Sequence, residues 1–248
     1  MPLTFAHPAA VLPLGRRLPL AALVVGSMAP DLVYFLLLAR GERFGHTLPG
    51  LFVFCIPAGL ALLWSVDHVL RRPMLALGPD GLRARLPATP PARPLGVTVF
   101  AIWIAAVTHA VWDAFTHGGT WATALVPALE RVVGIDRGGD PVTAFEVAQH
   151  ISTALGLLVV TTALVRWWRR TPPHPVPHGL SVGERVKRLV LLGGIAAVPA
   201  VWSGIVRSTR SAVIEDFFAS AVVVGVAVAF WLSVAYSLAV RHRARRGA

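Results

Sequence analysis

The chain has 248 residues, of which 55% are hydrophobic and only 14% are charged, and its mean hydropathy is +0.66. A soluble domain carries about 25% charged residues, so this composition excludes an ordinary soluble enzyme and indicates an integral membrane protein. The formal net charge is +11, but the arginines lie between apolar stretches, so we expect no nucleic-acid partner. The single cysteine, Cys55, excludes a disulfide framework.

Six apolar stretches approach the roughly 20 residues that a helix needs to cross a bilayer. In chain order they are residues 18–39, 48–70, 95–116, 149–168, 189–206 and 213–240. Proline-rich connectors separate the second stretch from the third and the fourth from the fifth. The sequence predicts an all-α, polytopic transmembrane bundle of about six membrane segments. We expect one integral membrane domain over residues 1–248, with a metal-site half in 1–170 and two further membrane helices in 180–248.

Lys and Arg residues are abundant in every second connector and scarce in the connectors between. If the N-terminus is cytoplasmic, 17 of the 23 Lys and Arg residues fall in inner segments and 6 in outer ones. Cytoplasmic segments carry such an excess in membrane proteins. The Ala-, Arg- and Pro-rich composition resembles that of proteins from high-GC bacteria. We therefore expect a multi-pass protein of the bacterial cytoplasmic (inner) membrane with both termini in the cytoplasm.

Ionisable side chains inside membrane segments are costly, and they usually mark function. Six of them fall at one depth under this topology, near the outer ends of the first four stretches. They are Asp31, His46, His109, Asp113, His117 and His150.

Three of these residues follow one another on the third stretch. His109, Asp113 and His117 have the spacing i, i+4, i+8, which places them on one face of a helix. Imidazole and carboxylate groups together suit Zn, Mn or Fe. The alternative is a hydrogen-bond ladder that satisfies buried polar groups. For the whole set we predict a divalent-metal site, with zinc as the first expectation and Mn, Fe or Mg as alternatives.

His7 precedes Asp31 by 24 residues, which is about 36 Å along a continuous helix. Prolines and a glycine interrupt the segment between them. If residues 5–14 and 19–31 form a helical hairpin, His7 returns beside Asp31 and the first segment is re-entrant. The alternative is that His7 caps an N-terminal helix at the membrane interface.

Short motifs combine the same residues with their neighbours. They are Pro-Leu-Thr-Phe-Ala-His-Pro from residue 2, Gly-Ser-Met-Ala-Pro-Asp from 26, His-Thr-Leu-Pro-Gly from 46, Thr-His-x2-Trp-Asp-x2-Thr-His from 108, and Gln-His from 149. In combination they resemble the bacterial family described as domain of unknown function 4184. The resemblance covers about residues 1–170, and it implies no particular activity.

The order of these ligands is also remotely similar to the zinc phospholipase C and single-strand nuclease superfamily. Inner-membrane metal-dependent hydrolases share a Pro-Asp, a following His and a His-x3-Asp helix. The resemblance implies a first metal at Asp31, His46, His109 and Asp113, a second at His117 and His150, and a third at His7 with Asp113 bridging.

The chain departs from that superfamily in two places. In that superfamily the last metal ligand is a carboxylate four residues after the final His. At that position this chain has Ala154. Glu146, one turn before His150, could substitute as a ligand. The superfamily's third metal uses an N-terminal Trp, whereas this chain begins Met1-Pro2.

These patterns predict a membrane-embedded metal-dependent hydrolase of a lipid-type phosphate ester or diphosphate, with isoprenoid diphosphate chemistry included. Asp113, His117 and His150 would be its catalytic groups. The expected partner is a membrane lipid or lipid-linked phosphate substrate, and the oligomeric state stays open. Two alternatives remain. One is a proton- or ion-coupled transporter or channel, and the other is a non-catalytic scaffold with a structural metal.

Overall fold

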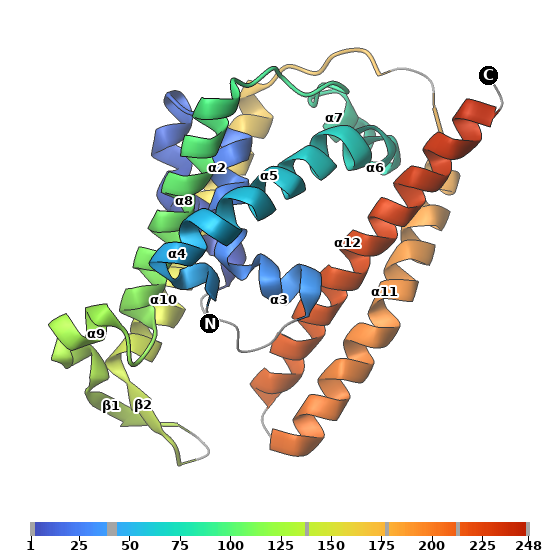
Figure 1. The fold of residues 1–248 in the computed structure, drawn as a ribbon. Helices are drawn as coiled ribbons and strands as arrows, with labels where there is room; N and C mark the ends of the chain where they lie inside the picture. The colour runs from blue at the N-terminus through green and yellow to red at the C-terminus, as the bar shows by residue number, and fades with distance from the viewer. Residues whose placement is uncertain (1–2, 39–43, 137–138, 177–178, 212–213, 247–248) are drawn as a thin grey trace. The chain divides into compact units, whose positions relative to one another are not determined.

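Figure 1 shows the fold as a computed structural model. It describes residues 3–38, 44–136, 139–176, 179–211 and 214–246. The chain separates into two compact units. The first unit comprises Met1–Asp31, Arg43–Leu63 and Arg93–Arg170, and the second comprises Leu32–Glu42, Trp64–Ala92 and Thr171–Ala248. Two segments that precede residue 170 therefore group with the last two helices.

Five helices in the described part of the chain are long and apolar enough to cross a membrane. They are Leu48–Leu77, Leu95–Thr116, Ala144–Arg170, Val182–Ser208 and Phe217–Arg246. Many large apolar side chains on them are exposed, as expected of surfaces that face lipid. The predicted class, an all-α polytopic membrane protein, is confirmed.

The first apolar stretch, 18–39, is the exception, because short elements replace a single long helix there. α2 covers Leu20–Gly26, a 3-10 turn covers Ala29–Asp31, and α3 covers Leu32–Leu37. Pro30 lies in the break, where a residue without a backbone N–H disfavours continuing the helix.

The N-terminal segment folds back along α2 as a helical hairpin. α1 (Pro8–Val11) and the 3-10 turn Leu12–Arg16 run in one direction, and both contact the returning α2. The Thr4 hydroxyl then donates a hydrogen bond to the Asp31 carboxylate, 27 residues further along the chain. Of the two alternatives that the sequence leaves open for residues 5–31, the described structure has the helical hairpin.

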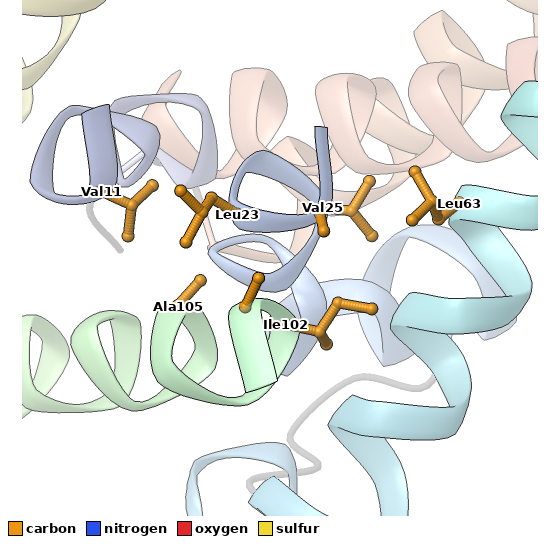
Figure 2. Close-up of a cluster of buried hydrophobic side chains, with 8 residues drawn as sticks. Val11, Leu23, Val25, Leu63, Ile102 and Ala105 are labelled. Atoms are coloured by element: carbon orange, nitrogen blue, oxygen red, sulfur yellow. The ribbon is translucent and has the colours of Figure 1, made fainter. Parts of the chain in front are cut away.

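The core of the first unit lies between this hairpin and α8 (Leu95–Thr116). In Figure 2, Leu23 and Val25 of α2 lie over Ile102 and Ala105 of α8. A Cβ at Gly26 would lie 2.4 Å from the Ile102 carbonyl oxygen, so only glycine permits this approach. The close packing brings the end of α2 beside the middle of α8.

Two further parts complete the first unit. Phe44–His46 forms a 3-10 turn, and a helix follows as α4 (Leu48–Gly50), a π-helical turn (Leu51–Cys55) and α5 (Ile56–Trp64). Beyond α8 come α9 (Trp121–Leu125), the 3-10 turn Pro127–Glu130, the antiparallel strands β1 (Val132–Ile135) and β2 (Pro141–Thr143), and α10 (Ala144–Arg170). α10 packs on α1 and on the 3-10 turn Thr4–Ala6.

The second unit is built on a helix pair, α11 (Val182–Ser211) and α12 (Ile214–Arg246), which lie side by side in Figure 1. The hydroxyl oxygens of Ser203 and Ser220 lie 2.6 Å apart between them. The π-helical turn Ser65–Leu70, α6 (Arg71–Leu77) and α7 (Asp80–Arg83) belong to the same unit.

Candidate metal centre

Short turns bring two of the candidate ligands together. Asp31 ends the 3-10 turn Ala29–Asp31, and His46 ends the 3-10 turn Phe44–His46. A Cβ at Gly45 would lie 2.5 Å from the Pro30 carbonyl oxygen, so glycine is what lets these turns touch. The Cys55 thiol donates to the Gly45 carbonyl at 3.3 Å and supports the contact from the next helix.

The other two ligands come from α8. His109 and Asp113 lie one turn apart on its buried face, and the Nε2–Oδ2 distance between them is 3.3 Å. This i, i+4 pair is the part of the site that the sequence spacing predicts directly.

Four donor atoms, one from each of these residues, lie within 4.8 Å of one another. His46 Nε2 is 3.2 Å from His109 Nε2 and 3.2 Å from Asp113 Oδ2. Asp31 Oδ1 is 3.5 Å from His46 Nε2 and 3.7 Å from His109 Nε2. A tetrahedral zinc site with bonds of about 2.0–2.2 Å separates its donors by about 3.3–3.6 Å. The group therefore has the dimensions of a four-ligand metal site and could hold a metal ion.

Outer contacts aim these donors at a common point. His109 Nδ1 lies 2.7 Å from the Ser27 carbonyl oxygen. Because a carbonyl only accepts, His109 must donate from Nδ1, and its Nε2 lone pair faces the group. Thr4 binds Asp31 Oδ2, which leaves Asp31 Oδ1 turned inward.

The polar balance inside the group favours a cation. Asp31 Oδ1 is buried and has no hydrogen-bond partner in the described part of the chain. His46 Nε2 faces both carboxylates and the Nε2 of His109, yet it carries at most one proton. Burial disfavours the imidazolium form of His46, but the adjacent carboxylates of Asp113 and Asp31 outweigh it and raise its pKa to about 9. A bound ion would stand in the place of that proton.

The donor set is two imidazole nitrogens and two carboxylate oxygens. It suits zinc or a first-row transition metal better than Mg, which prefers oxygen ligands only. Three of the ligands are sealed in the interior. The side chain of His46 is 19% exposed, so the site can be reached from its side.

His7 lies against the group without belonging to it. Its ring stacks on His109 with centroids 3.8 Å apart, and its Nε2 lies 3.0 Å from Asp113 Oδ1. Burial lowers the pKa of His7. Because a carboxylate oxygen only accepts, His7 donates to Asp113 from Nε2. Asp113 thus offers one oxygen to the four-donor group and the other to His7.

The remaining predicted residues lie outside the four-donor group. His117 follows the last turn of α8, and its backbone is extended (φ −133°, ψ 145°), so it is not the third member of a helical ladder. Gly118 and Gly119 come next, and Gly119 has a φ of +67°, so the chain does not resume the helix after His117. His117 is half-buried, and its Nδ1 donates to the Asp113 carbonyl at 2.9 Å. Its place in a second metal site stays a prediction.

His150 and Glu146 lie on the first turns of α10. His150 is exposed, and its Nδ1 donates to the Glu146 carbonyl at 2.7 Å. Glu146 accepts from the Thr143 backbone N–H at 2.7 Å and from the Thr143 hydroxyl at 2.8 Å, as a helix-capping carboxylate does. Their roles as ligands also stay predictions.

Sequence reasoning did not assign roles to Thr4 and Ser27, which orient Asp31 and His109. Both residues lie inside the short motifs described above, beside the ionisable residues, and this proximity is the signal that could have found them. Trp112, whose indole N–H donates to Ser152 at 3.1 Å, packs its ring 5.2 Å from that of His7.

Fold and site together define a polytopic helical membrane protein with a buried His and Asp group that could hold a metal ion. The chain matches the model of the family described as domain of unknown function (DUF4184) over residues 1–240, and it belongs to that family. The match extends beyond residue 170 and takes in most of the last two helices. No curated protein and no solved structure matches the chain.

Proposed function

We propose that this protein is a membrane-embedded, metal-dependent hydrolase of a phosphate ester or diphosphate of lipid character. The observation that carries the proposal is the convergence of four donor atoms from Asp31, His46, His109 and Asp113. Their chemistry and spacing suit zinc first, with Mn and Fe as alternatives. When bound, the ion would polarise a phosphoryl oxygen and make water more acidic.

The chain's own groups have separable roles in this proposal. The four donors hold the ion, and His7 fixes Asp113 through its second oxygen. His117 and His150 each donate a hydrogen bond from Nδ1 to a backbone carbonyl one turn earlier. Their Nε2 atoms are then available for proton transfer. In the reaction a water oxygen bonds to phosphorus and the phosphorus–oxygen bond to the lipid breaks. One of these histidines takes the water's proton, and the leaving oxygen receives one.

The lipid character of the substrate follows from the setting of the site. Its ligands lie beside candidate membrane spans whose outer faces are apolar, so a substrate with a long apolar chain would reach His46 from the bilayer. The remote similarity to zinc phospholipases supports a phosphate ester, and an isoprenoid diphosphate would fit the same donors.

We place the protein in the bacterial inner membrane. The described part of the chain holds five candidate spans, and the N-terminal hairpin is not one of them. The arginine excess supports a cytoplasmic position for the end of α12, as expected for the C-terminus. A re-entrant hairpin would leave the N-terminal segment on the other side, so the position of the N-terminus stays a proposal to be tested. A cysteine placed at Arg243 should react with a maleimide only after the membrane is permeabilised.

The direct test is phosphate release by the purified protein loaded with zinc or manganese, against lipid phosphates and diphosphates in mixed micelles. We expect turnover that disappears in His109→Ala and survives in His68→Ala, whose imidazole lies outside the site. Metal-loaded, folded protein without turnover on any of these lipids would contradict the hydrolase. Metal-dependent ion flux in proteoliposomes would then favour a transporter, and neither activity would favour a structural metal.

A further inference from the structure

The second unit contains a cavity of about 540 Å³ that the proposed hydrolase does not use. Its basic lining residues are Arg72 on α6, Arg83 and Arg85 near α7, and His174 after α10. The apolar part of its wall includes Leu75 and Leu86.

Two proline-rich connectors build this cavity. The His174 backbone N–H donates to the Ala84 carbonyl at 2.7 Å and joins the connector after α10 to the connector after α7. Nearby, Arg185 of α11 binds the Gly78 carbonyl at 2.9 Å and the Asp80 carboxylate at 2.7 Å. These bonds hold the connectors around a hollow where prolines prevent regular structure.

The charge of the cavity is positive. Among the described residues that line it, none carries a carboxylate. Asp80 lies nearby and forms ion pairs with both Arg83 and Arg185. Its single negative charge therefore cannot neutralise both arginines. Arg85 is held by the Gly81 carbonyl at 2.9 Å. Guanidinium groups held in this way are suited to binding phosphate oxygens in pairs.

The cavity also lies where a membrane surface is expected. Arg72 is near the end of the candidate span Leu48–Leu77, and His174 follows the end of Ala144–Arg170 by four residues. Arginine counting puts both ends at the cytoplasmic face. Basic pockets at that face suit the headgroups of anionic lipids.

We propose that this cavity binds the phosphate headgroup of an anionic phospholipid of the surrounding membrane. The arginines contact the phosphate, and the wall formed by Leu75, Leu86 and Val176 contacts the first part of the acyl chains.

Native mass spectrometry of the detergent-purified full chain tests the proposal. Titrations with phosphatidylglycerol and with zwitterionic phosphatidylcholine measure the preference for the anionic lipid. We expect the wild-type chain to bind phosphatidylglycerol about tenfold more tightly, since each nearby arginine adds to the attraction. The double variant Arg72→Gln with Arg85→Gln should lose that preference.

Arg169→Gln with Arg170→Gln is the matched control, because it removes the same charge from an exposed pair outside the cavity. It should keep the preference. An equal loss in both double variants, or no preference in the wild-type chain, would overturn the proposal. If the cavity pair does not fold, Arg72→Gln alone, at an exposed position, should still weaken binding severalfold. Displacement of the lipid by inorganic phosphate at equal concentration would overturn it too, because the site would then take a soluble anion.

Discussion

His109 Nδ1 lies 2.7 Å from the carbonyl oxygen of Ser27, 82 residues earlier in the chain. This bond links the end of α2 to the middle of α8 and decides which nitrogen of His109 faces the other ligands. The geometry of the candidate site therefore depends on how closely the hairpin packs on α8. Mutations in the backbone around the site should act on metal binding even where they change no ligand.

Gly45→Ala tests this dependence. A Cβ at this position would lie 2.5 Å from the Pro30 carbonyl, so the turn that carries His46 must move away from Asp31. We expect metal affinity to fall by about tenfold or more, with a loss of about 1–3 kcal/mol in stability. Competition with a chromophoric chelator measures the affinity. Gly96→Ala is the control, because a Cβ there meets nothing within 4 Å, and equal affinities in the two variants would refute this account.

His7→Gln tests whether His7 supports the site or belongs to it. A glutamine removes the stacked ring and the hydrogen bond to Asp113, but it leaves the four donors in place. Loss of such an outer contact typically costs about 10–100-fold in metal affinity. The variant should therefore still bind one ion, more weakly, whereas His109→Ala should bind none. Complete loss of metal in His7→Gln would make His7 a ligand.

Metal removal should lower thermal stability, because the ion binds only the folded chain. At an ion concentration of 100 times Kd, the stabilisation is about 2.7 kcal/mol. Thermal unfolding in detergent, with chelator and then with added zinc, should show a reversible rise in Tm in the wild-type chain. Asp31→Asn should show a much smaller rise. A rise of the same size in the variant would mean that the ion binds elsewhere.

The ion pair between Asp80 and Arg185 should stabilise the second unit in a pH-dependent way. The hydrogen bond from Arg185 holds the pKa of Asp80 below its ordinary value of 3.8. A carboxylate with a lowered folded-state pKa contributes stability above its unfolded pKa and loses that contribution as the pH falls through the folded one. Asp80→Asn should therefore lower Tm at pH 5–7, and the difference should shrink only below about pH 4. A difference that disappears near pH 6 would show that another group is responsible.

Much of the site follows from the sequence, because charged groups are rare in apolar segments and therefore conspicuous. His109 and Asp113 follow from helical spacing. Asp31 and His46 were predicted as ligands because the arginine-based topology places them at the same membrane depth as His109 and Asp113. The prolines in the first stretch allow a hairpin, but they do not by themselves decide between it and a continuous span.

Other features depend on contacts that spacing does not encode. The spacing predicted His117 as a third residue on the helix face of His109 and Asp113, but α8 ends at Thr116 and His117 is extended. Glu146 looked like a substitute ligand, but at this spacing from Thr143 its carboxylate also suits a helix cap, which is the contact observed. The support from Ser27 is a backbone carbonyl, and no side-chain pattern reveals it.

The central claim is that Asp31, His46, His109 and Asp113 bind one metal ion. Elemental mass spectrometry of the purified protein tests it most directly, with His109→Ala and Asp113→Ala beside the wild-type chain and His68→Ala as the control. We predict about one equivalent of zinc, manganese or iron in the wild-type chain and in His68→Ala, and none in the two ligand variants. Folded wild-type protein that carries no metal after supplementation, or ligand variants that retain a full equivalent, would contradict the claim.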